Sequence, residues 1–178
     1  MKYRVLLFLI FLGVVSCSKQ EARRPITSSK TYTLASTAEG LKKINKIEEA
    51  KIEDYIKRDS LHMYTRSPNG FWYRYITKTV NELITPQKND IIEIQYDFVD
   101  LNNQTIYSKE QIGIKEYKVD REDFIPGLQI GIKMMKVGET IKFLIPSYNA
   151  FGIIGDENKI GINQSIISTI TLLNIKSK

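Results

Sequence analysis

The sequence predicts an α+β domain in which an antiparallel sheet wraps on one short helix. A longer helix precedes this domain in the chain. Three observations indicate this fold. Apolar residues recur at helical spacing between about 37 and 58, several later segments alternate between apolar and polar residues, and one short apolar segment lies between two glycines.

The first 16 residues have the composition of an export signal. Lys2 and Arg4 precede an apolar run, residues 5–12, that is too short to span a bilayer, and a small residue stands before Cys17. Cys17 is the only cysteine, so it has no partner for an internal disulfide. We therefore expect residues 1–16 to be removed and Cys17 to carry a lipid. A free thiol behind an ordinary cleaved signal, or an uncleaved anchor, is the alternative.

Length and charge limit the remaining classes of function. Without the signal, about 160 residues remain, which suits one compact domain and a spacer. The formal charge of +6 includes Lys2 and Arg4, and the rest is spread along the chain. This distribution gives no reason to expect nucleic-acid binding and supports at most weak attraction to an anionic membrane. The polar segment 17–36 is expected to be a lipidated tether.

A helical segment is expected at 37–66, with its helix ending near residue 58. Ser36 and Glu39 have the spacing of a capping box. One apolar stripe is formed by Leu41, Ile44, Ile47, Ile52, Tyr55 and Ile56. The charged face, expected to be solvated, contains Lys42, Lys43, Glu48, Glu49, Lys51 and Asp54. The stripe can pack on the following domain or on a second copy of the chain, which would give a homodimer.

The folded domain is expected at 67–178. A turn at 68–70 is followed by segments with strand periodicity. The expected strands are 71–76, 90–100, a short one around 117–119, 141–145 and 166–175. In the second of these, Ile92, Ile94, Tyr96 and Phe98 share one face. Residues 128–135 are expected to form the short helix, because Gly127 and Gly138 bracket an apolar run of suitable length.

Large apolar residues stand near loops that contain glycine. They are Tyr96, Phe98, Phe124, Ile125, Leu128, Phe151 and Ile160. Each alone is typical of a protein core. Together they are also compatible with an apolar pocket of the kind that binds proline rings, and no cofactor or metal is expected among them.

Two other classes of site are excluded by the motifs. His62 is the only histidine and lies in the approach to the expected domain, so neither a histidine-based metal site nor a Ser-His-Asp triad can be assembled there. Gly152, Gly155 and Gly161 are not followed by the Gly-Lys-Ser or Gly-Lys-Thr of a phosphate-binding loop. A flap beside an apolar pocket explains these glycines better.

Four short motifs in order resemble the signature of FKBP-type peptidyl-prolyl isomerases. They are residues 124–128 (FIPGL), 134–139 (MMKVGE), 145–146 (IP) and 150–152 (AFG). The resemblance extends from about residue 70 to residue 175 and implies an FKBP-like sheet wrapped on its helix. The aromatic first strand and the motif ending at Cys17 are further similar to FKBP-like lipoproteins of gliding bacteria.

The resemblance also implies a site. The backbone N–H of Ile125 would donate to the substrate carbonyl, and the proline cradle would be lined by Tyr96, Phe124, Leu128, Phe151 and Ile160. The sequence departs from the family pattern at four positions. Tyr107 replaces an aspartate, Leu128 replaces a tryptophan, Phe151 replaces a tyrosine, and Ser168 replaces an aromatic residue. These changes predict the loss of a carboxylate, a hydroxyl group and two aromatic walls, and hence weaker activity.

The function expected from this resemblance is a membrane-anchored peptidyl-prolyl isomerase that assists folding of exported, proline-containing polypeptides. It would lie in the cell envelope, facing the periplasm, and could serve a gliding motility machinery. The alternative is an FKBP-like chaperone or binding module that kept the pocket without the turnover.

Overall fold

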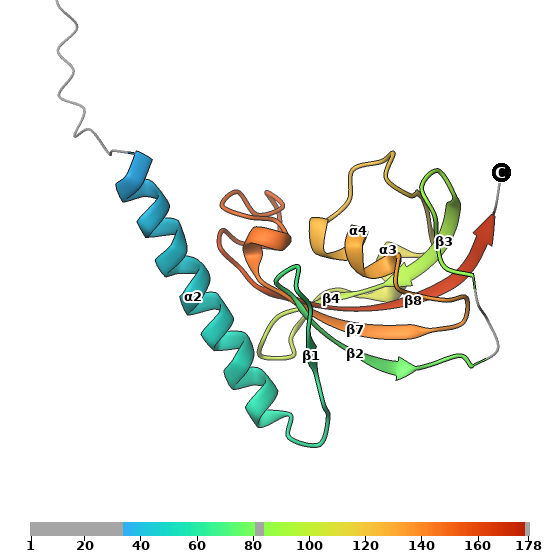
Figure 1. Ribbon diagram of the computed structural model, residues 1–178, viewed down its shortest axis with the longest axis horizontal. Coiled ribbons are helices and arrows are strands. Elements are labelled where there is room, and N and C mark those ends of the chain that lie inside the picture. Colours follow the sequence, from blue (N-terminus) through green and yellow to red (C-terminus); the bar gives the residue numbers. More distant parts are fainter. Residues whose placement is uncertain (1–33, 81–83, 177–178) are drawn as a thin grey trace, which may run out of the picture. The chain divides into compact units, whose positions relative to one another are not determined.

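The computed structural model describes residues 34–80 and 84–176 (Figure 1). The expected signal peptide, the lipidation of Cys17 and most of the expected tether lie outside these residues. Within them, no helix is both long enough and apolar enough to cross a membrane.

An antiparallel sheet forms the centre of the domain. The elements in chain order are α2 (Leu34–Arg58), β1 (Thr65–Arg66), β2 (Trp72–Thr77), β3 (Ile91–Tyr96), β4 (Phe98–Val99), β5 (Thr105–Tyr107), α3 (Lys109–Ile112), β6 (Lys115–Lys118), α4 (Pro126–Ile132), β7 (Thr140–Ile145), a 3₁₀ turn (Ser147–Asn149) and β8 (Ile166–Lys176). The strand order is β1-β2-β7-β8-β3-β6, and β4 pairs with β5 and β8. The predicted fold class is confirmed.

The two faces of the sheet carry two separate apolar clusters, because side chains alternate along each strand. On one face, Phe71 and Phe143 pack with Leu128 and Ile132 of α4. On the other, Trp72, Leu144 and Ile167 pack with Ile52 and Tyr55 of α2. The sheet is therefore covered by α4 on one side and by the C-terminal half of α2 on the other (Figure 1).

The expected strand at 90–100 is interrupted at Asp97. Its apolar face is buried as predicted, but β3 ends at Tyr96 and β4 starts at Phe98. The Asp97 carboxylate accepts a 2.7 Å hydrogen bond from the backbone N–H of Thr169, so a side chain replaces a backbone partner at this point of the ladder. The interruption turns β4 towards β5, which the sequence did not indicate.

The helix α2 differs from its predicted form in two ways. It begins at Leu34, so Ser36 lies inside it and is not its N-cap. The apolar stripe is also divided, since Ile52 and Tyr55 are buried whereas Leu41 and Ile47 are 45% and 48% exposed. Only the C-terminal half of the stripe therefore packs on the domain.

The prediction that Glu48 lies on a solvated face is wrong. This residue is 2% exposed. Its carboxylate accepts hydrogen bonds from the backbone N–H of Ser147 (2.6 Å), the Ser147 hydroxyl (2.7 Å) and the Ser165 hydroxyl (3.0 Å). A buried carboxylate requires such donors, and they come from the two ends of the loop between β7 and β8.

Candidate functional site

A cavity of about 500 Å³ opens beside the N-terminus of α4. It is lined mostly by aromatic and aliphatic side chains. The lining residues are Tyr96, Phe98, Tyr107, Asp123, Phe124, Ile125, Pro126, Ala150, Phe151 and Asp156. Four of the six predicted site residues thus meet at one cavity: Tyr96, Phe124, Ile125 and Phe151.

The other two predicted residues, Leu128 and Ile160, do not line the cavity. Both are buried, and both belong to the apolar cluster that contains Tyr96, Phe98 and Ile125. The direct lining role that the family resemblance implied for them is not seen in this structure. Because they pack in the same cluster as the lining residues, Leu128 and Ile160 support the cavity wall.

The aromatic wall is held by edge-to-face contacts. The Tyr96 ring packs against Phe98 at 5.3 Å and against Phe124 at 5.4 Å between centroids, and Phe98 packs against Phe151 at 5.6 Å. Aromatic pairs prefer this geometry, in which the edge of one ring meets the face of the other. The wall therefore consists of rings that fix one another.

The start of α4 places Ile125 at the cavity. Pro126 suits the first helical position, because its missing N–H would have no partner there. The carbonyl of Ile125 accepts from the N–H groups of Leu128 and Gln129, and the Gln129 side chain donates to the carbonyl of Phe124 at 2.9 Å. Within the described ranges, no acceptor pairs with the N–H of Ile125. This donor is available to a ligand.

The structure restores the carboxylate and the hydroxyl that the sequence predicted to be lost. The Tyr107 hydroxyl donates a 2.6 Å hydrogen bond to the Asp156 carboxylate, and both residues line the cavity. Asp156 comes from the loop between β7 and β8, so its place in the site could not be inferred from the family positions. Its neighbours in sequence give no signal for this role.

Ionisation of this pair follows from its hydrogen bonds. Burial opposes the charged form of Asp156, but donors from Tyr107 and from the backbone N–H groups of Ile160 and Asn158 outweigh it and lower the pKa of the carboxyl group. The same bond to Asp156 raises the pKa of Tyr107. At neutral pH the carboxyl group of Asp156 is therefore ionised and the phenol of Tyr107 is protonated.

Two buried hydroxyl groups lack hydrogen-bond partners among the residues that the structure describes. The Ser168 hydroxyl, on the strand position where the family pattern has an aromatic, is fully buried and has no hydrogen-bond partner among residues 34–80 and 84–176. The hydroxyl of Tyr117 is also buried without a partner among these residues, and the Tyr117 ring packs against Phe124 with 5.2 Å between centroids. The missing wall at Ser168 is thus not replaced by a polar contact.

A family model for FKBP-type peptidyl-prolyl cis-trans isomerase matches residues 83–173. The chain belongs to this family. The matched region contains the whole cavity lining, so the chain is an FKBP-type peptidyl-prolyl isomerase whose catalytic domain holds the cavity described above.

Solved structures of other proteins have the same fold. The chain is similar to FkpA from Escherichia coli, with 22% identity, a TM-score of 0.61, and 99% of this chain and 82% of that chain covered. It is also similar to a peptidyl-prolyl cis-trans isomerase from Pseudomonas syringae pv. tomato, with 16% identity, a TM-score of 0.59, and 73% and 93% covered. A comparison with curated protein sequences gave no match.

Proposed function

We propose that this FKBP-type isomerase acts on exported, proline-containing polypeptides while held at a membrane by a lipid on Cys17. The observation that carries the catalytic part is the cavity, in which aromatic rings surround an unpaired backbone donor, the N–H of Ile125. In this proposal Tyr96, Phe124 and Phe151 hold the proline ring, and Ile125 binds the carbonyl oxygen of the substrate.

The reaction requires rotation about one amide bond and no proton transfer. The barrier is about 18–20 kcal/mol because rotation removes amide resonance. The planar amide separates charge between oxygen and nitrogen, whereas the twisted form separates less. An apolar cavity therefore disfavours the planar form more than the twisted one, and each 1.36 kcal/mol of this difference accelerates rotation about tenfold.

The location is proposed from the sequence. The positively charged start, the short apolar run and Cys17 support export and lipidation, with the domain in the cell envelope facing the periplasm. Growth with a labelled fatty acid tests this proposal: the label should enter the natural protein and not the Cys17→Ser variant. Label in both proteins would contradict it.

A narrower role in motility rests on the resemblance to the gliding motility lipoprotein GldI. We propose that the chain assists proteins of a gliding machinery, its clients being those whose folding is limited by slow isomerisation of prolyl bonds. Deletion of the gene in its own host should then impair gliding, and a copy with a disabled cavity should not restore it. Normal gliding of the deletion strain would reject this role.

A homodimer is proposed from the exposed half of α2. Leu41 and Ile47 lie on the part of the helix whose apolar stripe does not pack on the domain. A second copy of the same helix would cover them. Sedimentation of the full-length protein should show a dimer that Leu41→Lys with Ile47→Lys converts to a monomer. A natural protein that sediments as a monomer would refute the proposal.

A binding module without turnover is the second candidate. It is favoured by the buried, unpartnered Ser168 hydroxyl and by Leu128 and Phe151, which replace larger or more polar groups of the family pattern. The Tyr107 and Asp156 pair weakens this candidate, because it returns polar groups to the cavity.

A refolding assay separates the two candidates. Folded full-length protein at micromolar concentration should accelerate refolding of a substrate limited by prolyl isomerisation. Phe151→Ala should lower kcat/KM at least about tenfold through lost apolar contact. Ile153→Ala is the matched control, since Ile153 is 66% exposed in the same loop and does not line the cavity. Binding of the substrate without acceleration would favour the binding module.

A further inference from the structure

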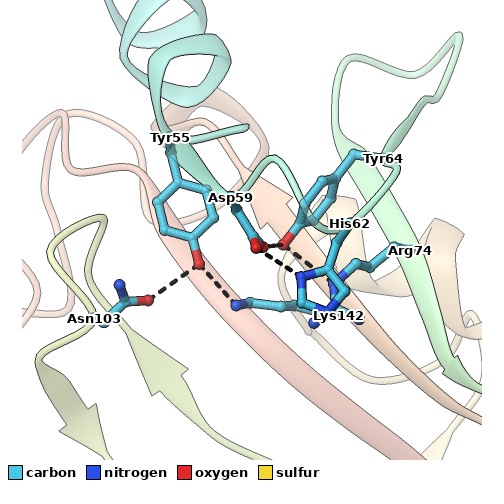
Figure 2. Close-up of polar contacts among 7 residues, drawn as sticks. All are labelled: Tyr55, Asp59, His62, Tyr64, Arg74, Asn103 and Lys142. Atoms are coloured by element: carbon cyan, nitrogen blue, oxygen red, sulfur yellow. Dashed lines mark hydrogen bonds and ion pairs between the residues drawn. The ribbon is translucent and has the colours of Figure 1, made fainter. Parts of the chain in front are cut away.

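A second hollow, of about 360 Å³, lies where the end of α2 meets the outer face of the sheet (Figure 2). Arg74 of β2 and Lys142 of β7 contribute to it, and they share the face of the sheet that carries Trp72 and Leu144. This face is opposite the cluster that supports the isomerase cavity. The hollow is therefore separate from the catalytic site.

Arg74 and Lys142 stand directly opposite each other on antiparallel strands. Like charges in this position repel each other and destabilise the sheet. Among the residues that the structure describes, neither side chain has a carboxylate within 4.0 Å. The pair thus has an electrostatic cost that no direct ion pair offsets.

The contacts that these cations do make are with neutral tyrosines: Lys142 lies over the Tyr55 ring and Arg74 over the Tyr64 ring, and each also donates to a tyrosine hydroxyl. Lys142 Nζ donates to the Tyr55 hydroxyl at 2.8 Å, and Arg74 Nε donates to the Tyr64 hydroxyl at 3.2 Å (Figure 2). Tyr55 in turn donates to the Asn103 side-chain oxygen at 3.1 Å. These bonds fix the two positive groups in place without neutralising them.

Asp59, the one carboxylate among the described residues that line the hollow, already has partners. Asp59 accepts from the Tyr64 hydroxyl at 2.7 Å through one oxygen and lies 2.6 Å from His62 Nδ1 through the other (Figure 2). Arg58 also lines the hollow, so three permanent cations face one carboxylate. The end of α2 adds about half a negative charge, which is less than the surplus of two positive charges.

A purely structural role explains only part of this arrangement. The bonds of Tyr55 and Tyr64 would fasten the end of α2 to the sheet with any small polar partners. They do not account for two cations placed face to face beside an open hollow. A bound anion would account for them, because it would offset the repulsion and accept from the terminal guanidinium nitrogens of Arg74, which donate to no residue in the described part of the chain.

We propose that this hollow binds a phosphate group. A phosphate dianion matches the surplus of two positive charges, and an arginine fork beside a lysine is a common arrangement for binding phosphate oxygens. The volume lies near the lower limit for ligand sites, so the rest of the ligand is small. The phosphate can come from a soluble monoester or from a lipid headgroup.

Calorimetric titration of the full-length protein with inorganic phosphate and glycerol 3-phosphate at low salt tests the proposal. Binding should saturate at one ligand per chain. The Arg74→Gln, Lys142→Gln double variant should bind at least about tenfold more weakly. Lys78→Gln is the matched control, because Lys78 also lies over a tyrosine ring, that of Tyr75, but is not part of the hollow; it should bind as the natural protein does.

Co-sedimentation with phosphatidylcholine vesicles that contain phosphatidic acid identifies the source. If the protein binds these vesicles with much higher affinity than it binds glycerol 3-phosphate, and the double variant does not bind them, the ligand of the hollow is a lipid headgroup. Binding to glycerol 3-phosphate alone assigns it to a soluble ligand. Absence of binding to every probe, or equal loss in the double and control variants, overturns the proposal.

A measurement on the natural protein covers the case in which the double variant does not fold. Glycerol 3-phosphate should shift the backbone amide signals of residues 55–62, 74, 103 and 142 in an NMR titration. Signals of the isomerase cavity, such as those of Phe124 and Phe151, should not move. Shifts confined to that cavity would contradict the proposal.

Discussion

The carboxylate of Glu48 accepts a 2.6 Å hydrogen bond from the backbone N–H of Ser147, a residue 99 positions later in the chain. Glu48 also accepts from the Ser165 hydroxyl. Ser147 and Ser165 are the two ends of the loop that contributes Phe151 and Asp156 to the isomerase cavity. One side chain of α2 therefore joins the N-terminal helix to both ends of the loop that forms one side of the site.

Replacing Glu48 should destabilise the protein strongly. Glu48→Ala leaves the Ser147 N–H buried without a partner, so the free energy of unfolding should fall by about 2–3 kcal/mol. Glu48→Gln keeps one oxygen acceptor and should cost less. Urea unfolding measures both, with Glu53→Ala, an exposed glutamate of the same helix, as control. A Glu48→Ala variant as stable as Glu53→Ala would show that the bonds at Ser147 contribute nothing.

The bond between Tyr107 and Asp156 should influence catalysis. Tyr107→Phe removes one hydrogen bond at the cavity, which corresponds to about a two- to tenfold loss in kcat/KM. Tyr75→Phe is the control, because Tyr75 is a half-buried tyrosine that does not line the cavity. Activity assays on a proline-containing peptide provide the comparison. Equal activity of both variants would remove any role for this hydroxyl.

The same pair should make stability depend on pH. The pKa of Asp156 is lowered below 3.8 in the folded protein, so its contribution to stability is complete above this value and is lost as the pH falls through the folded pKa. The difference in unfolding free energy between the natural protein and Asp156→Asn should thus be constant from pH 5 to 7 and shrink in acid. A difference that grows as the pH falls would contradict the assignment.

The elements of this fold were predictable where local pattern decides them. The alternation around Ile92 and Ile94 gave β3, and the spacing of Ile52, Tyr55 and Ile56 gave α2, because each pattern matches the period of one regular structure. The short helix was predicted at residues 128–135, whereas α4 spans Pro126–Ile132, because Pro126 suits the first helical position. These features depend on neighbours within a few residues.

The features that the sequence missed depend on distant parts of the chain. The burial of Glu48 follows from Ser147 and Ser165, which only the complete fold brings to it. Asp156 enters the cavity because its loop turns back with Gly155 at φ 77°, where a side chain would meet the Ile160 carbonyl. Neither contact has a local signal, so neither was predictable from the pattern of neighbouring residues.

Replacing each of the two buried serines at and just before β8 with alanine should change the free energy of unfolding in opposite directions. Ser168→Ala removes a hydroxyl without a partner and should raise the unfolding free energy by about 1 kcal/mol. Ser165→Ala removes a donor to Glu48 and should lower it by about 1 kcal/mol. Thermal and urea unfolding measure both changes. Destabilisation by Ser168→Ala would mean that its hydroxyl has a partner after all.

The most direct test of the proposed site is the prolyl isomerisation rate of a short peptide, measured by NMR exchange with full-length protein and two variants of Ile125. Ile125 has φ −56°, which proline can adopt, so Ile125→Pro removes the N–H donor at a compatible backbone angle. Ile125→Val shortens the side chain and keeps the donor. We predict at least about a tenfold lower rate for Ile125→Pro and nearly normal exchange for Ile125→Val. Equal rates for both folded variants would contradict the proposal that this N–H binds the substrate carbonyl.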